Sequence, residues 1–227
     1  MQVARAHLRN VGLVLVATVA LVAVGGGAAA AEGDRTSAID RVQAWLDGAS
    51  TLAGAFEQTL VSGALGGDVA ESGRLCIRRP GSMRWDYEVP ERKTAIVRDG
   101  ATLLYLEVER QAIEGTLDQG GGVLLALLAG DRPLTELFAE APAREDDPVA
   151  PRGADIVRLR PLDADGTFES VALVVRRKTG AILAARVRDS AGNVMDYTFP
   201  DLRRNVDLPR ETFEFRVPDG TEMLAGG

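Results

Sequence analysis

Apolar and polar residues alternate along two long stretches of the chain, and this pattern is typical of antiparallel sheet. Glycine, proline and aspartate punctuate both stretches at intervals that suit tight turns. The pattern predicts strands over 56–62, a hairpin over 73–87, and further strands over 94–98, 101–108, 110–117, 155–161, 168–176, 182–189, 193–202 and 213–217. We therefore expect nine to eleven strands, nearly all antiparallel.

Three short helices are predicted besides these strands. The first carries an apolar stripe at helical spacing, formed by Ile39, Val42, Trp45 and Leu46. Residues 123–128 are apolar on all sides, and 133–139 begins with a proline at a position that helices tolerate. A large antiparallel sheet must cover its apolar face or close on itself. We therefore expect a mainly β fold, an incomplete, half-open antiparallel barrel with a helical lid over an apolar cavity.

Arg79 is the most informative residue of the predicted hairpin. The alternation places it on one face with five apolar side chains, Leu75, Ile77, Met83, Trp85 and Tyr87. An arginine on an apolar face is costly unless something accepts its hydrogen bonds. Either its aliphatic stem packs while the guanidinium reaches water, or it has a polar partner elsewhere in the chain.

The first 31 residues have the pattern of a cleaved signal peptide. Arg5 and Arg9 give a positive start, residues 11–24 form an apolar core, and 29–31 supply the small residues of a cleavage site. The apolar core is short for a membrane anchor. We expect residues 32–227 to form one domain that is free rather than lipid-anchored.

Composition and charge narrow the function classes. The chain of 227 residues is 46% hydrophobic and 26% charged, which is ordinary for a globular protein. Its formal charge of −7 argues against a nucleic-acid partner, which would need a basic surface. The single cysteine, Cys76, excludes an internal disulfide.

The sequence lacks the usual signatures of an enzyme. Its one histidine, His7, lies in the predicted signal peptide, so the commonest general base and metal ligand is missing from residues 32–227. Two sets of acidic residues stand out, Asp86 with Glu88 and the run 145–147. Either set could belong to a glycosidase pair or a calcium site. Solvated surface charge is the simpler interpretation. We expect no enzymatic activity, no metal and no cofactor.

Several short motifs resemble one known family. They are spread in order over almost all of residues 32–227, at 55–58, 72–75, 79–85, 90, 99–100, 103 and 213–220. The element Arg-Pro-x-x-aromatic-x-Trp is the most specific, although Met83 replaces its aromatic residue here. With these motifs the chain resembles the outer-membrane lipoprotein carrier protein (LolA) family.

The resemblance implies both a fold and a function. It implies an incomplete barrel with a helical lid, and a monomeric periplasmic carrier that binds the acyl chains of triacylated lipoproteins. It also implies two partners, an inner-membrane ABC transporter that releases the lipoprotein and an outer-membrane acceptor that receives it.

The resemblance also assigns roles to residues. Arg79 matches an arginine that holds the lid closed by hydrogen bonds to lid backbone carbonyls. The residues expected to line the acyl-chain cavity are Phe56, Leu75, Ile77, Met83, Trp85, Tyr87, Leu124, Leu128, Leu137 and Phe138.

Other functions remain open on the sequence. The same half-barrel suits a periplasmic module that senses lipids or lipoproteins and reports to a membrane protein, although such regulators resemble two-domain chains. An acceptor at the outer membrane would need a lipidated cysteine just after the signal peptide, and the sequence has none there.

Overall fold

One large, open sheet organises the chain. A computed structural model describes residues 37–61, 67–116, 123–130, 132–162 and 168–226, all within one unit, Thr36–Gly227. The predicted signal peptide lies outside the described residues. The strands are β1 (Thr51–Val61), β2 (Val69–Arg78), β3 (Ser82–Val89), β4 (Lys93–Arg98), β5 (Ala101–Leu106), β6 (Gln111–Thr116), β7 (Phe138–Glu140), β8 (Ala154–Pro161), β9 (Phe168–Arg176), β10 (Ile182–Asp189), β11 (Val194–Thr198), β12 (Arg203–Arg204) and β13 (Glu222–Ala225).

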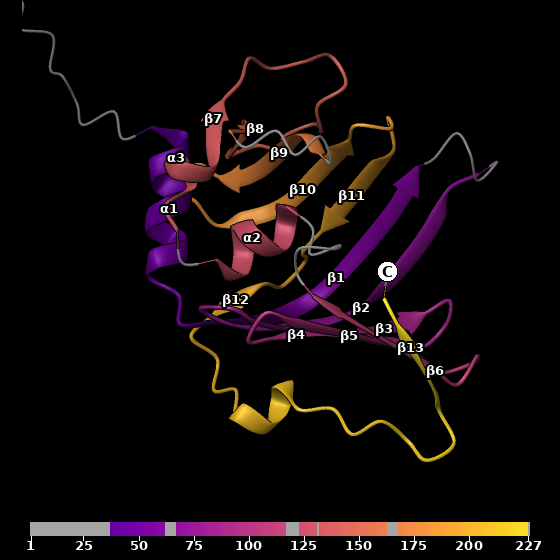
Figure 1. Ribbon diagram of the computed structural model, residues 1–227. Helices are drawn as coiled ribbons and strands as arrows, with labels where there is room; N and C mark the ends of the chain where they lie inside the picture. Colours follow the sequence, from indigo (N-terminus) through magenta and orange to yellow (C-terminus); the bar gives the residue numbers. More distant parts are fainter. Residues whose placement is uncertain (1–36, 62–66, 117–122, 131, 163–167, 227) are drawn as a thin grey trace, which may run out of the picture. The chain divides into compact units, whose positions relative to one another are not determined.

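The sheet curves without closing, as the sequence predicts. Its order is β13-β6-β5-β4-β3-β2-β1-β11-β10-β9-β8-β7, with β12 beside β1. Strands β2–β6 form a first antiparallel meander, and strands β7–β11 form a second. Strand β1 joins the two meanders because it pairs with β2 on one edge and with β11 on the other. The ends of the order, β13 and β7, do not pair, so the barrel stays half open. Figure 1 shows α2 between the two arms of this curved sheet.

The described residues contain thirteen strands, more than the nine to eleven predicted. The excess comes from β7, β12 and β13, which have only two to four residues and are too short to show an alternation. The predicted last strand, 213–217, is wrong. A 3₁₀ helix, η2 (Arg210–Phe213), ends there and the chain then continues irregularly. Phe213 and Phe215 alternate as in a strand, but they pack on the sheet instead of joining it.

In the described part of the chain, three α-helices lie on the concave side of the sheet (Figure 1). They are α1 (Ala38–Asp47), α2 (Val123–Ala129) and α3 (Leu134–Leu137). The third is shorter than predicted because the chain enters β7 at Phe138. A capping box between Ser37 and Asp40 begins α1 and satisfies backbone N–H groups of its first turn. Within the described residues, no helix has the length and apolar character needed to cross a membrane.

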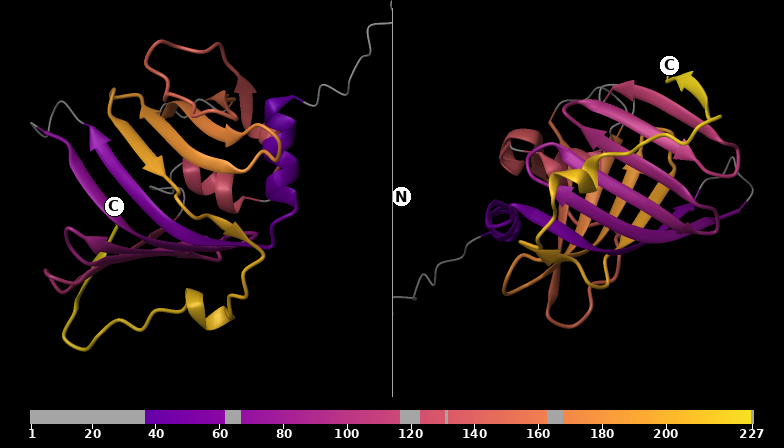
Figure 2. Two further views of the ribbon diagram at one scale, coloured as in Figure 1. Left: turned by 180° about the vertical axis from the view of Figure 1, so that it is seen from behind. Right: turned by 90° about the horizontal axis from the view of Figure 1, so that it is seen from below.

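Alternation divides the side chains between two faces. On β2, Leu75 and Ile77 face the helices and are fully buried, whereas Cys76 faces the other way. The outer face beside Cys76 is covered by the C-terminal segment, residues 205–226, which runs across it (Figure 2). Leu208 and Phe213 of this segment form a second small apolar cluster there. Burial raises the pKa of the Cys76 thiol.

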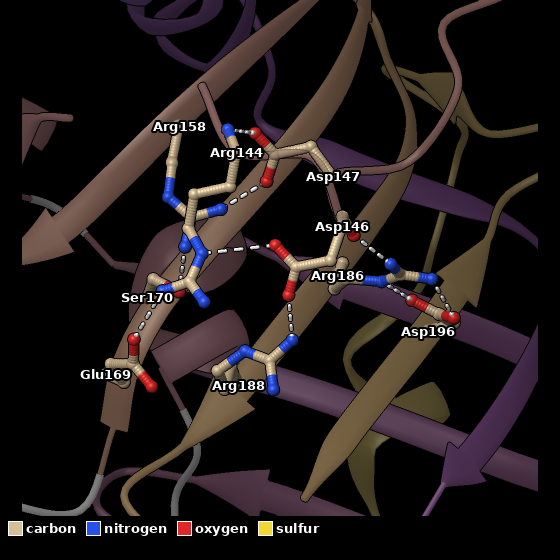
Figure 3. A network of polar contacts seen from close by, with 9 residues as sticks. All are labelled: Arg144, Asp146, Asp147, Arg158, Glu169, Ser170, Arg186, Arg188 and Asp196. Carbon is tan, nitrogen blue, oxygen red and sulfur yellow. Dashed lines mark hydrogen bonds and ion pairs between the residues drawn. The ribbon is translucent and has the colours of Figure 1, made fainter. Parts of the chain in front are cut away.

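The acidic loop 141–153 is held on the outer face of the second meander by a network of ion pairs (Figure 3). Asp147 pairs with Arg158 of β8, and both side chains are more than nine-tenths buried. Arg158 also donates to Ser170 Oγ of β9 at 3.0 Å. Asp146 bridges to Arg188 of β10. Two acids of the run, Asp146 and Asp147, are therefore paired with arginines of the sheet.

Candidate functional site

The concave side of the sheet encloses one large apolar cluster. All ten residues predicted to line the acyl-chain cavity belong to it, from β1, β2, β3, α2, α3 and β7. Eight of them are buried, and Tyr87 and Leu137 are partly buried against the rest. The tertiary structure thus brings together residues from position 56 to position 138. Their role in binding acyl chains stays a prediction.

Aromatic rings fill the middle of this interior. The Phe56 ring contacts the Trp85 ring edge to face at 4.5 Å between centroids, and the Tyr87 ring at 5.0 Å. The Tyr197 ring reaches Trp85 at 5.7 Å from the opposite arm of the sheet. Such pairs add roughly 0.5–1.5 kcal/mol each to the burial of their area. An apolar ligand would therefore have to replace side-chain contacts as it enters.

Two cavities lie on the other face of the sheet, under the C-terminal segment. The larger has a volume of about 690 Å³ and is lined by Ile96, Leu103 and Phe213 among others. The smaller has a volume of about 360 Å³ and adjoins it at Arg98. Because Ile96 points away from its neighbours Ala95 and Val97, which pack on the core, these cavities are separate from the predicted lipid site.

Arg79 joins two helices to the turn that follows β2. Its backbone N–H donates to the Ser50 carbonyl at 2.9 Å, which fixes the start of the turn. Its Nη1 donates to the carbonyl oxygen of Leu46 in the last turn of α1. Its Nη2 donates to the carbonyl oxygen of Gly130, directly after α2, at 2.7 Å.

These acceptors explain how an arginine fits beside an apolar interior. The last carbonyls of a helix have no partner within the helix, and a cation near the helix C-terminus is favourable. Arg79 supplies hydrogen-bond donors and a positive charge at the C-terminal ends of both α1 and α2. The Arg79 guanidinium therefore has polar partners elsewhere in the chain, which is the second of the two alternatives that the sequence left open. A second contact beside it, from the Gly81 N–H to the Ala129 carbonyl at 2.9 Å, holds the same turn to α2.

Pattern reasoning on the sequence missed the polar side chains on the same concave face. Gln58, Glu71 and Lys93 lie there, beyond the aromatic rings and away from Arg79. The alternation on β2 would have placed Glu71 on the face of Leu75. No local pattern indicates that Lys93 of β4 meets it, because that depends on strand order.

Three of the five carboxylates singled out in the sequence, those of Asp86, Asp146 and Asp147, form ion pairs. Asp86 accepts from Arg84 Nε at 2.7 Å and from Thr94 Oγ1 at 3.0 Å, while Glu88 is exposed. Of the acids of 145–147, Asp146 and Asp147 belong to the network of Figure 3, and Glu145 is exposed. In the part of the chain that the structure describes, no group of three histidine, cysteine or acidic residues is arranged to hold a metal ion.

Comparison with known proteins gives a consistent match. The family model described as "Outer membrane lipoprotein carrier protein LolA" matches residues 47–216. An outer-membrane lipoprotein carrier protein of Chromobacterium violaceum is 31% identical over 197 residues, covering 85% of this chain and 89% of that protein. One of Cupriavidus pinatubonensis is 30% identical, covering 83% and 87%. A crystal structure of an uncharacterized conserved protein from Thermus thermophilus shares the fold at a TM-score of 0.50 with 13% identity, covering 83% of this chain and 97% of that one.

Proposed function

Because the chain belongs to the outer membrane lipoprotein carrier protein LolA family, we propose that it binds the acyl chains of lipoproteins and carries them between membranes. In this proposal residues 1–31 direct the chain to the periplasm and are removed. An inner-membrane ABC transporter loads the carrier with a triacylated lipoprotein, and an acceptor at the outer membrane receives it.

The physical requirement for such a carrier is an apolar interior that opens and closes. Each methylene group removed from water contributes about 0.8 kcal/mol, so long acyl chains need an enclosed apolar space. The cluster between the sheet and the three helices is the largest apolar interior of the described residues. It supports the proposal because helices that are separately attached to the sheet can move away from it without unravelling the strands.

The observation that carries the proposal is the pair of hydrogen bonds from Arg79 to Leu46 and Gly130. A hydrogen bond to a charged group contributes roughly 1.5–3 kcal/mol. Two such bonds give a closed state that a bound ligand or a partner protein can overturn. We propose that Arg79 is the latch of this lid and that the residues predicted from the sequence line the space beneath it.

A binding assay with the full chain tests this function. An environment-sensitive fluorescent fatty acid is titrated into the purified protein and then displaced with a synthetic triacylated lipopeptide. We expect saturable binding and complete displacement. Absence of binding by both the natural chain and the Arg79→Leu variant, whose lid lacks the latch, would contradict the proposal.

Matched variants sharpen the assay. Arg79→Leu is expected to bind the lipopeptide at least as well as the natural chain but to release it poorly to an acceptor, because the closed state that competes with ligand is weakened. Arg98→Leu removes an arginine that is half exposed on the outer face, and we expect it to change neither step. Equal release by Arg79→Leu and the natural chain would show that Arg79 is not a latch.

A further inference from the structure

A row of polar side chains crosses the concave face at the end of the interior that lies away from Arg79. The row contains Tyr197 of β11, Gln58 of β1, Glu71 of β2, Tyr87 of β3 and Lys93 of β4. Strand register places them side by side, because Gln58 pairs with both Tyr197 and Glu71, and Tyr87 pairs with Lys93.

The position of the row along the strands divides the interior lengthwise. On β2, Glu71 lies seven residues before the last strand residue, Arg78, which corresponds to about 23 Å at 3.3 Å per residue, and Arg79 follows directly. Between them, Leu75 and Ile77 are buried in the apolar cluster. Figure 1 shows α1 and α2 on the side where β1 starts, whereas the end of β1 extends away from them. Among the described residues, the row thus lies toward the end of the apolar interior that the helices do not cover.

Glu71 is the centre of the hydrogen bonds in the row. Lys93 Nζ lies 2.5 Å from Glu71 Oε1, and Gln58 Nε2 donates to Glu71 Oε2 at 3.1 Å. The Tyr87 hydroxyl donates to Gln58 Oε1 at 3.4 Å, and the ammonium of Lys93 lies 4.3 Å from the centre of the Tyr87 ring. An ammonium has three donors and an amide has two, so a bond to Glu71 uses up neither group.

Both tyrosines remain hydrogen-bond donors at neutral pH. Burial raises the pKa of Tyr87 well above its usual value, and the nearby Tyr197 and Glu71 raise it further. Burial and the charge of Glu71 likewise raise the pKa of Tyr197. Each hydroxyl gives its one hydrogen to a neighbour, Tyr87 to Gln58 Oε1 and Tyr197 to Met195 Sδ. The spare donors of the row are therefore those of the Lys93 ammonium and the Gln58 amide, beside a single carboxylate.

Stability alone is a poor reason for such a row. Partly buried ion pairs lose much of their attraction to desolvation, and apolar residues of similar size often replace them without loss. Three of the five side chains, those of Gln58, Tyr87 and Tyr197, are largely buried beside an apolar core. A fold that needed only a packed interior would be served as well by leucine or phenylalanine at these positions.

Resting on the proposed function, we propose that this row is the subsite for the polar head of the lipid, where the side chains of Gln58 and Lys93 donate hydrogen bonds to its ester and amide carbonyls and the Tyr87 hydroxyl holds Gln58 in place. Acyl chains would fill the apolar part between the row and Arg79, and the carbonyls that join them to glycerol and to the peptide would otherwise lose their hydrogen bonds with water on entry. Glu71 holds Lys93 and Gln58 in position within the row.

The test compares two ligands that differ only in their carbonyl groups. One is a triacylated lipopeptide with ester-linked chains, and the other is the same lipopeptide with ether linkages in place of the esters. We expect the natural full chain to bind the ester form about tenfold more tightly, which corresponds to about 1.4 kcal/mol. The double variant Lys93→Met with Glu71→Gln removes the charge pair without leaving a carboxylate unpaired, and we expect its preference to fall below about twofold.

Controls separate this subsite from the carrier function itself. Lys178→Met alters an exposed lysine of the β9–β10 turn and is expected to retain the tenfold preference. Lys93→Arg keeps a hydrogen-bond donor and is expected to retain part of the preference for the ester form. This single variant also tests the subsite if the double variant does not fold. Equal binding of the ester and ether forms by the natural chain, or an unchanged preference in the folded double variant, would overturn the proposed subsite but leave the proposed carrier function standing. Failure of the natural chain to bind either form would overturn the proposed function.

Discussion

Arg79 and Gly130 are 51 residues apart in the chain, and the Arg79 guanidinium donates to the Gly130 carbonyl at 2.7 Å. Through this bond and its companion to Leu46, one side chain connects the β2–β3 turn to the C-terminal ends of two helices. The same turn is anchored on the sheet by the backbone bond to Ser50. A single substitution would remove this shared link and leave the other bonds to the helix ends, from Gly81 to Ala129 and from Arg204 to Trp45.

Replacing Arg79 with leucine should loosen the helices and leave the sheet intact. Two hydrogen bonds to a charged group are lost, each worth roughly 1.5–3 kcal/mol, while leucine suits the apolar surroundings. We expect the amide of Gly48, which donates to Ala44 at the end of α1, to exchange with solvent about ten to a hundred times faster. Hydrogen exchange followed by mass spectrometry or NMR measures this effect.

The amides of β9 and β10 provide the reference for that experiment, because these central strands are far from the latch in the sheet order. Their exchange should not change in Arg79→Leu. Faster exchange throughout the sheet would instead mean that Arg79 supports the whole fold.

Gly180→Ala should destabilise the protein more than the same change at Gly192. Both glycines have positive φ, of 71° and 86°, so alanine is strained at either position. A Cβ at Gly180 would lie 2.0 Å from the carbonyl oxygen of Arg41, whereas a Cβ at Gly192 meets nothing within 4 Å. We expect Gly192→Ala to cost about 1–2 kcal/mol and Gly180→Ala to cost at least about 2 kcal/mol more.

Urea denaturation of the two variants measures the difference. If they unfold at the same urea concentration, the β9–β10 turn does not press on α1 as closely as the structure indicates, and only the shared backbone strain remains.

The buried pair between Arg158 and Asp147 should matter more than an exposed pair. Arg158→Met leaves the Asp147 carboxylate, only 3% exposed, without its cation, and breaking a buried pair typically costs about 3–5 kcal/mol. The double variant Arg158→Met with Asp147→Leu should recover part of that loss. Trypsin cleavage after Arg144 or Arg152 offers a second readout, because both arginines are already exposed and a released loop can adopt the extended conformation that the protease needs.

Arg132→Met is the matched control, since its pair with Glu136 lies 3.5 Å apart and is more than half exposed on both sides. Its cost should stay below about 0.5 kcal/mol. Equal costs for Arg132→Met and Arg158→Met would refute the view that the network fastens the loop.

Acidic conditions should weaken the same network through Asp146. Desolvation alone would raise the pKa of Asp146, but the charges of Arg144 and Arg188, with hydrogen bonds, outweigh it and lower the pKa below its usual value. A lowered pKa in the folded state means that the ionised carboxylate favours folding above the unfolded value of about 3.9, and that this contribution is lost as the pH falls through the folded value.

Thermal unfolding of the natural chain and of Asp146→Asn between pH 7 and pH 2 measures this contribution. The difference in melting temperature should be constant above about pH 5 and should shrink as the pH falls below about 4. A difference that does not depend on pH would show that Asp146 acts through its shape or its backbone and not through its charge.

Much of the fold was predictable because its signals are local. The alternation in 73–87 predicts the β2–β3 hairpin, and Leu75 indeed pairs with Trp85 and Ile77 with Met83. The apolar stripe within 39–46 predicts α1, and the four residues of that stripe are buried. The C-terminal region departs from its local pattern, because Phe213 and Phe215 alternate as in a strand but pack against the outer face of the sheet.

The sequence by itself determined which side chains share a face, because a strand alternates with a period of two and a helix with a period of 3.6. It thereby placed Arg79 with the apolar interior and predicted an open sheet with helices over it. Only the tertiary structure decided which carbonyls Arg79 meets and that Glu71 joins Gln58 and Lys93 in one row. Those contacts depend on strand order and on helix ends distant in the chain, and backbone carbonyls are the same at every residue, so no local pattern distinguishes them.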